Sequence, residues 1–341
     1  MTAPAGRERC SRLLALGDSI TVGVGDTVGP DAEYGPGWAA HLATVLGMEA
    51  FTNLASNGAR SHDVARTQLD AALALRPRVA TVLVGGNDVL RSDFDARLTL
   101  TDLHRSVSEL VRGGADVVLV RLPVIGLFEL SPRLVRHVMR RRVAAINAAV
   151  DEVAVAVGAA EASAPGPGNG PKSARGRVVV VDATQAIASA GAKAWHVDRV
   201  HPSPAGHRRL ALAAATALAD LDPAYLAALV PPSENGAVSP ASTARKATQF
   251  SPAEVGTGTP RAAALAALLP EAPDPPSVWQ RVVWLLRAGL PWCLRRGRDF
   301  LPGLLRAVVH DLRAERAFTP GGMLTSFADS GLDPRRRIGR G

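Results

Sequence analysis

Short apolar runs alternate with helix-like segments over the first 220 residues, and this alternation constrains the fold more than any other feature. The runs are continuously apolar, which is typical of strands that are buried on both faces of a parallel sheet. The segments between them carry apolar residues at three- to four-residue spacing, as amphipathic helices do. We therefore expect an α/β domain with helices on both faces of a five-stranded parallel sheet. The predicted strands are residues 12–17, 48–55, 78–86, 115–122 and 177–182.

The predicted helices carry recognisable end signals. Ser131-Pro132 and Ser203-Pro204 each place an N-capping serine before a proline suited to the first helical turn. Gly47 is placed to end an earlier helix. The predicted helices are residues 37–47, 62–75 and 99–112, a long one from Ser131 to about Val157, and residues 204–219.

Composition divides the rest of the chain. Residues 158–176 are rich in Ala, Gly, Pro and Ser, which predicts a flexible insertion in a domain that spans residues 11–220. Residues 231–276 read as a Pro/Ala/Ser-rich linker, with one Ala/Leu helical patch at 261–269. Residues 318–341 are expected to form a disordered basic tail.

The positive charge lies mainly in the C-terminal part of the chain. The formal net charge is +8, and from Ser277 onward twelve arginines face five acidic residues. Because the rest of the chain is nearly neutral, we expect no nucleic-acid partner. Cys10 and Cys293 are the two cysteines, and they form no disulfide or metal-binding pattern. We expect no metal and no cofactor.

Residues 277–317 combine arginines with three of the five tryptophans. Trp279, Val282, Leu285 and Leu286 share one helical face. This pattern fits helices that pack on the domain or on a protein partner, and it also fits a helix lying on an anionic membrane surface. The N-terminal apolar run is shorter than a secretory signal requires. We expect a cytoplasmic location, either free or at the periphery of the membrane.

Four polar motifs follow predicted strands or precede the last helix. They are Gly17-Asp18-Ser19, Asn53 to Gly58, Gly85 to Asp88, and Asp198 to His201. Each alone is compatible with an ordinary turn. In parallel sheets, however, ligands bind beyond the carboxyl ends of the strands, where these motifs are expected to meet.

In order and spacing the motifs resemble the GDSL, or SGNH, hydrolase family over residues 11–220. Ser19, Gly58, Asn87 and His201 match its four conserved blocks, and Asp198 stands three residues before the histidine. The resemblance implies a three-layer α/β/α, flavodoxin-like fold and hydrolysis of an ester through an acyl-serine intermediate. It leaves open a lipase-like ester, a carbohydrate or metabolite O-acetyl ester, and a thioester.

The residue chemistry agrees with this implication. A serine hydroxyl becomes a good nucleophile when a base removes its proton, and His201 is the candidate base for Ser19. Asp198 is placed to hold the second ring nitrogen. The resemblance implies an oxyanion hole formed by the backbone N–H groups of Ser19 and Gly58 and the Asn87 amide.

Several alternatives stay open at this stage. His196 is a second candidate base, whereas His207 is interpreted as a structural residue of the last helix. Asp18 and Asp88 are expected to support their loops through hydrogen bonds. The apolar loop at 123–130 is either part of an acyl pocket or packed on the sheet. A non-catalytic scaffold protein that acts through residues 277–317 is the alternative of another class.

Overall fold

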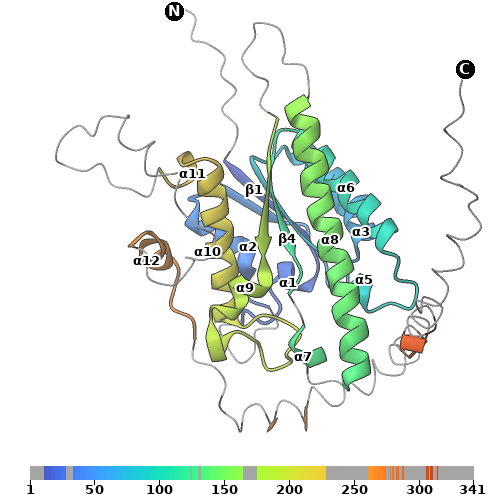
Figure 1. The fold of residues 1–341 in the computed structure, drawn as a ribbon. Helices are drawn as coiled ribbons and strands as arrows, with labels where there is room; N and C mark the ends of the chain where they lie inside the picture. The colour runs from blue at the N-terminus through green and yellow to red at the C-terminus, as the bar shows by residue number, and fades with distance from the viewer. Residues whose placement is uncertain are drawn as a thin grey trace, which may run out of the picture.

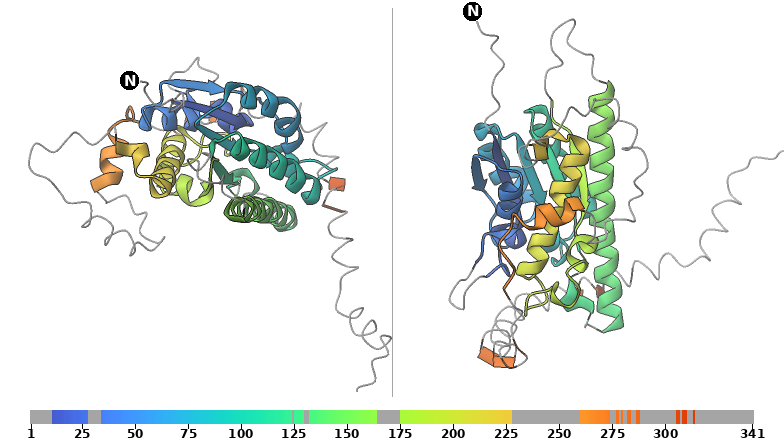
Figure 2. Two further views of the ribbon diagram at one scale, coloured as in Figure 1. Left: turned by 90° about the horizontal axis from the view of Figure 1, so that it is seen from above. Right: turned by 90° about the vertical axis from the view of Figure 1, so that its left-hand side faces the viewer.

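The computed structural model describes a three-layer α/β/α domain (Figures 1 and 2). It describes residues 11–27, 34–123, 125–129, 132–163, 175–227 and 260–273, and eleven further residues between 277 and 313, namely 277, 279, 282, 283, 286, 287, 305, 306, 308, 309 and 313. Most of segment 277–317, all of 318–341 and the predicted linker up to residue 259 lie outside the described residues.

Five parallel strands form the central sheet in the order β2-β1-β3-β4-β5. The chain moves from β1 to β2 on one side and then returns to β3 on the other side of β1. The sheet therefore has a switch point between β1 and β3, where the loops after the two strands diverge and leave room for a ligand. The strands are β1 (Arg12–Gly17), β2 (Ala50–Asn53), β3 (Val79–Leu83), β4 (Asp116–Arg121) and β5 (Val178–Asp182).

Helices cover both faces of the sheet, as predicted (Figure 2). On one face lie α2 (Gly37–Val45), α9 (Ala183–Ala188) and α10 (Pro204–Leu221), and on the other lie α4 (Leu69–Leu75), α6 (Ala96–Arg112) and α8 (Arg133–Ser163). The shorter helices are α1 (Ser19–Val22), α3 (Ser61–Asp63), α5 (Gly86–Val89), α7 (Gly126–Glu129), α11 (Ala224–Ala227), α12 (Pro260–Ala266), the π-helix Val64–Gln68 and the 3₁₀ turn Gly191–Lys193.

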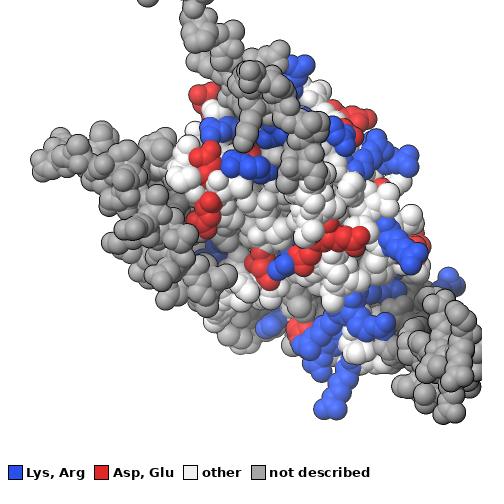
Figure 3. Space-filling model, turned by 45° about the horizontal axis from the view of Figure 1, so that its top comes forward, with Lys and Arg blue, Asp and Glu red and all other residues white. Residues whose placement is uncertain are grey.

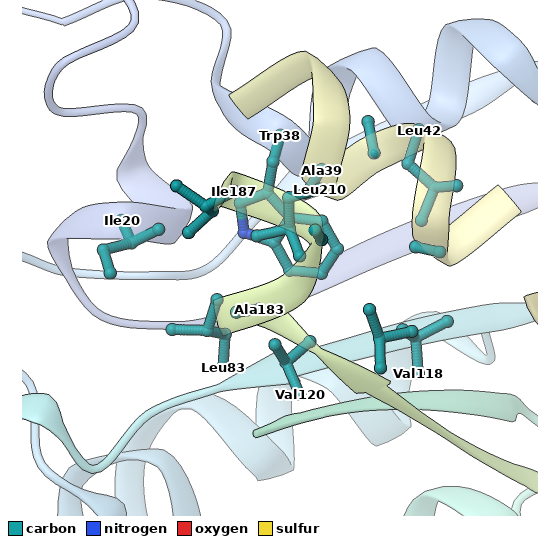
Figure 4. Packing of buried hydrophobic residues seen from close by; sticks show 14 of the residues in the cluster. Ile20, Trp38, Ala39, Leu42, Leu83, Val118, Val120, Ala183, Ile187 and Leu210 are labelled. Atoms are coloured by element: carbon teal, nitrogen blue, oxygen red, sulfur yellow. The ribbon is translucent and has the colours of Figure 1, made fainter. Parts of the chain in front are cut away.

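Alternate residues of each strand enter the two cores. Leu13 and Ala15 of β1 belong to the core under α2 and α10, and Leu14 and Leu16 belong to the core under α4 and α6. In the first core the fully buried Trp38 lies beside Leu210 and Ile187 (Figure 4). Burial of a large apolar side chain contributes about 1.5–3 kcal/mol, so these two layers stabilise the sheet that carries the site.

Helix α8 is longer than predicted. It continues through Ser163, so the first six residues of the predicted insertion at 158–176 are helical, and residues 164–174 lie outside the described part. By length and hydropathy alone, residues 133–160 could cross a membrane. Val143, Ile146 and Val150 are buried in the cores beside the sheet, and this packing accounts for the apolar character.

The predicted linker is not a linker over its whole length. Leu265 and Leu269, in and just after α12, are buried in the same core as α10. Arg208 of α10 donates a hydrogen bond from Nε to the carbonyl oxygen of Pro270, 2.8 Å away. Residues 260–273 are therefore packed on the α/β domain, because the Ala/Leu patch supplies an apolar face that α10 can bury.

The surface charge is unevenly distributed. Acidic and basic side chains are interspersed over the upper part of the face in Figure 3, and basic side chains gather towards its lower end. By its position in Figure 1, this lower end corresponds to the first turns of α8, at the edge of the sheet where the strands end.

Candidate active site

The site begins at the switch point of the sheet. Gly17 of β1 pairs with Leu83 of β3, and the Asp18 N–H donates to the Leu83 carbonyl oxygen at 3.3 Å. The next residue, Ser19, is the first residue of α1, and Asn87 lies in α5, just after β3. The two motifs predicted after the first and third strands are thus brought together because those strands are neighbours.

Two side chains fix the backbone on either side of Ser19. The Gly17 N–H donates to Oε1 of the buried Gln68 at 2.8 Å, and Gln68 Nε2 donates to the Gly17 carbonyl at 3.0 Å. Asp18 caps α1, and its Oδ1 accepts from the Ile20 N–H at 3.1 Å. The sequence analysis assigned no role to Gln68, since a glutamine in a helix carries no distinguishing signal.

Ser19, His201 and Asp198 form a continuous chain of hydrogen bonds. The Ser19 hydroxyl lies 2.8 Å from His201 Nε2, and His201 Nδ1 lies 2.7 Å from Asp198 Oδ2. Asp198 Oδ1 also accepts from the backbone N–H groups of Val200 and His201, at 2.8 and 3.0 Å. The aspartate therefore organises the loop that carries the histidine as well as the imidazole itself.

The electrostatics of Asp198 define the tautomer of His201. Burial opposes ionisation of Asp198, but hydrogen bonds from His196 and His201 and the charge interaction with His201 outweigh it, so its pKa lies well below the usual range. An ionised carboxylate accepts the Nδ1–H of His201. The Nε2 lone pair then faces the Ser19 hydroxyl, which is the arrangement required of a general base.

The other candidate histidines lie elsewhere. His196 contacts Asp198 Oδ2 through Nδ1 at 3.3 Å, but the nitrogen that reaches Ser19 belongs to His201. His207 is fully buried, donates from Nε2 to the Val24 carbonyl at 3.0 Å and accepts from the Trp38 N–H at 3.2 Å. Burial lowers the pKa of His207 to about 4, so it stays neutral as a structural residue.

The loops after β2 and β3 are joined by hydrogen bonds close to Ser19. Gly58 is exposed with φ +80°, a conformation that favours glycine. The Asn87 amide donates to the Ala59 carbonyl at 3.0 Å and borders the cavity beside Ser19. Buried Asp88 accepts from the Ser61 N–H at 3.0 Å and from its hydroxyl at 2.7 Å, and so joins the two loops, as expected.

A buried charge cluster holds the loop behind Ser19. Asp26 is fully buried and accepts from His41 Nε2 at 2.7 Å, the Gly37 N–H at 2.9 Å and Arg208 Nη1 at 3.1 Å. Burial would raise the pKa of Asp26, but the hydrogen bond from His41 and the nearby histidines lower it. The cluster was not predicted, because its members are far apart in the sequence.

Gly25, next to Asp26, lets the Ser19 loop approach the His201 loop closely. A Cβ at Gly25 would lie 2.3 Å from the Pro202 carbonyl oxygen and 3.0 Å from the His201 Cβ. Any side chain at position 25 would therefore push the two catalytic loops apart. Gly25 and Asp26 together position Ser19 relative to His201.

A small cavity of about 40 Å³ opens beside Ser19. Most of its lining is aliphatic, and it includes Pro123 and Ile125 of the apolar loop at 123–130. Val124 and the side chains of Leu127 and Phe128 lie outside the described residues. The other lining residues are Asp18, Ser19, Ile20, Gly86, Asn87, Leu90, Leu122, Val143, Val200 and His201.

Asp18 provides a test of the electrostatics of this cavity. Burial raises its pKa from 3.8 to about 7, so the folded protein holds a proton that the unfolded chain releases. The free energy of unfolding of the wild type should therefore fall, relative to that of Asp18→Asn, as the pH rises from 4 to 7. The relative change is on the order of 3 kcal/mol, at about 1.4 kcal/mol per pKa unit.

Urea unfolding of both proteins at several pH values measures this difference. Asparagine is an equally good N-cap, so the variant keeps the start of α1. Parallel stability curves for the two proteins would show that Asp18 ionises normally and would contradict the prediction. Groups common to both proteins cancel in the comparison.

Among the described residues, no three His, Cys, Asp or Glu side chains gather in a way that could hold a metal ion. The chemistry available at this site is that of an activated serine: a nucleophile, a base, an orienting carboxylate and amide N–H donors. Such a set performs acyl transfer.

Comparison with known proteins gives the following. No curated protein matches the chain. Among solved structures, Axe2, an acetylxylan esterase from Geobacillus stearothermophilus, is 23% identical over 59% of this chain and 91% of its own, with a TM-score of 0.43. LAE5, an alpha/beta hydrolase enzyme from the metagenome of Lake Arreo, Spain, is 21% identical over 60% and 94%, with a TM-score of 0.44.

A match to a family model assigns the chain to a protein family. The model of the GDSL-like lipase/acylhydrolase family matches residues 15–209, which is more than half of the chain. This range contains every strand of the sheet from within β1 onward, as well as Ser19, Asn87, Asp198 and His201. The chain belongs to the GDSL-like lipase/acylhydrolase family, and it is a hydrolase of carboxylic esters.

Proposed function

We propose that this protein cleaves short-chain carboxylic esters through an acyl-Ser19 intermediate. The observation that carries the proposal is the hydrogen-bonded chain from Ser19 through His201 to Asp198, with distances of 2.8 and 2.7 Å. His201 takes the proton of the Ser19 hydroxyl as Oγ attacks the ester carbonyl. It then gives that proton to the departing alcohol, and Asp198 stabilises the transient imidazolium.

In the second half of the reaction, water replaces the alcohol and His201 again acts as the base. Water enters beside the acyl group, His201 removes its proton, and the resulting attack releases the carboxylic acid and restores Ser19. The oxyanion formed in both steps is assigned to the backbone N–H groups of Ser19 and Gly58 and to the Asn87 amide. The Asn87 amide borders the cavity beside Ser19 and donates to the carbonyl of Ala59, next to Gly58, which supports this role.

The cavity supports a short acyl group. A cavity needs about 10–15 Å³ to hold one water molecule, so about 40 Å³ takes a group of roughly three heavy atoms. Its aliphatic lining disfavours a charged acyl chain. An acetyl ester, including an O-acetylated carbohydrate or metabolite, therefore fits better than a long-chain lipid ester. A thioester with the same short acyl group would fit the cavity equally well.

A panel of p-nitrophenyl esters from acetate to laurate tests this size limit. We expect kcat/KM to be highest for acetate or propionate and to fall for longer chains. Val143→Ala removes volume from the cavity wall and should shift the optimum to a longer acyl chain. The optimum is read from the ratio of the kcat/KM values for short-chain and long-chain esters. A uniform loss of stability lowers both values and does not alter this ratio.

Val153→Ala is the matched control. Val153 lies on the same helix and is also buried, but it belongs to the other core and does not line the cavity. The control should lose stability and keep the acyl preference of the wild type. A wild-type optimum at octanoate or laurate, or the same shift in both variants, would contradict the proposed pocket.

We also propose that segment 277–317 contacts an anionic membrane surface through its exposed side chains around Trp279, whereas Val308 is buried in the same core as α10. Trp279, Val282, Val283 and Leu286 follow helical spacing and are exposed, Trp279 by 77%. Exposed Arg287, Arg306 and Arg313 lie in the same segment. Apolar and cationic side chains together are what an interfacial helix presents to anionic lipid.

Co-sedimentation with phosphatidylglycerol-containing vesicles tests this contact. The full chain should bind these vesicles, and Trp279→Asp with Leu286→Asp should weaken binding about tenfold or more, because two apolar contacts are replaced by charges. Val155→Asp, at an exposed valine of α8, is the control and should bind like the wild type. Equal binding to neutral vesicles, or no effect of the double substitution, would refute the proposal.

A further inference from the structure

Arginines from three segments lie near cavity-lining residues in the sequence or on the helix that reaches the cavity. We call Arg91, Arg133, Arg136, Arg140 and Arg199 the cationic rim. Four of them are exposed and Arg136 is half-buried. Arg91 follows α5, Arg199 belongs to the loop of His201, and the others lie in the first turns of α8.

Each part of the rim is joined to the cavity wall. Arg91 directly follows Leu90, and Arg199 directly precedes Val200, both of which line the cavity. Helix α8 reaches the cavity through Val143, and Arg142 beside it donates to the carbonyl oxygens of Val89 and Arg91, at 3.1 and 2.7 Å. Helix α8 therefore contacts the loop of Arg91 at its third turn, and its first turns continue towards the carboxyl edge of the sheet (Figure 1).

The acidic residues near the rim are already paired. Glu129 of α7 accepts two hydrogen bonds from Arg140, and its backbone carbonyl accepts from Arg136 at 3.0 Å. Asp93 pairs with Arg60 at 3.2 Å. Arg91, Arg133 and Arg199 have no acidic side chain within 4 Å among the residues that the structure describes. Three guanidinium groups are thus available at the mouth.

The charge at the mouth is a local feature of a nearly neutral domain. Of the 39 basic and 31 acidic residues, twelve and five lie beyond residue 276, so the first 276 residues carry a net charge of +1. The unpaired arginines of the cationic rim are therefore not a by-product of a basic composition. Guanidinium groups bind phosphate, sulfate and carboxylate through paired hydrogen bonds.

We propose that the cationic rim selects esters whose alcohol portion carries a negatively charged group. The inference rests on the proposed function, because the acyl group fills the small aliphatic cavity and the alcohol portion then extends towards the rim. The rim attracts the anion over a distance set by ionic strength and holds it while Ser19 attacks. The substrate class is an acyl ester of an alcohol that bears a phosphate, sulfate or carboxylate.

Two matched acetyl esters test the proposal: 4-acetoxybenzoate, which is anionic, and 4-acetoxybenzamide, which is neutral. The readout is the ratio of their kcat/KM values, compared between wild type and the double variant Arg91→Gln, Arg133→Gln. We expect removal of the two charges to lower this ratio about threefold to tenfold at low salt, and added salt to lower the wild-type ratio in the same way. Arg105→Gln, at an exposed arginine in the middle of α6, should leave the ratio unchanged.

The ratio of the two kcat/KM values tests the cationic rim separately from the proposed esterase function. Loss of hydrolysis of the neutral ester in Ser19→Ala supports the catalytic residues, whereas the ratio alone judges the rim. An identical ratio in wild type and double variant, at low and at high salt, would overturn the inference. So would an unchanged ratio combined with weaker sedimentation of the double variant on phosphatidylglycerol vesicles, which would assign the rim to membrane contact instead.

Discussion

Replacement of Ser19 with alanine is expected to lower kcat/KM for p-nitrophenyl acetate by about 10⁴-fold or more, since loss of the nucleophile removes the acyl-enzyme route altogether. His201→Ala should cost a similar factor, and the double variant little more than either single variant, because the two residues act as one unit. Initial rates on purified protein, with wild type alongside, measure this effect.

Folding must be retained for this loss to be informative. Ser19 packs little, and its hydroxyl bonds to His201 alone among the side-chain partners described. The Ser19→Ala protein should therefore unfold at the same urea concentration as the wild type, within error. A stable variant that keeps more than a tenth of the wild-type rate would show that another residue attacks the ester.

Replacement of Asn87 with alanine has the second largest expected effect. We predict a loss of about 10²–10³ in kcat with little change in KM, because an oxyanion donor acts on the charge that develops in the transition state. The amide also donates to the Ala59 carbonyl at 3.0 Å, and so helps to hold the loop of Gly58. Asn87→Asp keeps the size and should also be impaired, since it replaces a donor with a negative charge.

Asn57→Ala is the matched control. Asn57 is an exposed asparagine next to Gly58, and its amide donates to the Tyr34 hydroxyl at 3.2 Å. Removal of that bond should change kcat by less than threefold, on the order of one exposed hydrogen bond. Equal losses in Asn57→Ala and Asn87→Ala would point to a general disturbance of the loop and contradict the role of Asn87.

The sheet and its helices could be predicted from the sequence because they depend on local patterns. The apolar runs at residues 12–17 and 177–182 each became a parallel strand, although the predicted strand at 48–55 shortened to Ala50–Asn53. The predicted helix at 62–75 is divided into a short helix, a π-helical turn and α4. Apolar periodicity alone does not distinguish these helical forms, whose pitch depends on tertiary packing.

The proximity of Ser19, Asn87 and His201 could be predicted because Ser19 and Asn87 follow strands at the carboxyl edge of the sheet and His201 lies in the loop before the last helix. Their supporting residues could not, because those contacts join distant parts of the chain without a local signal. Asp26 meets Arg208 across 182 positions, and Gln68 meets Gly17 across 51. Nothing in the residues around them distinguishes a buried, hydrogen-bonded polar side chain from a solvated one.

The packing of α12 shows why amino-acid composition alone does not predict where a linker begins and ends. Pro, Ala and Ser are abundant in residues 231–276, which favours a linker. Yet Leu265 and Leu269 are enough for a short segment to be buried on α10, where Arg208 meets the Pro270 carbonyl. Two buried apolar side chains and one partly buried hydrogen bond contribute several kcal/mol, about what ordering a few residues costs.

The central claim, that Ser19 is the nucleophile activated by His201, is tested most directly by covalent labelling. In the reaction with p-nitrophenyl diethyl phosphate, Ser19 Oγ attacks phosphorus and p-nitrophenolate leaves, so a diethylphosphoryl group stays on the protein. Intact mass and peptide mapping should show one adduct, on Ser19, absent from Ser19→Ala and much slower to form in His201→Ala. An adduct on another residue that abolishes esterase activity, or unchanged labelling of Ser19→Ala, would contradict the account.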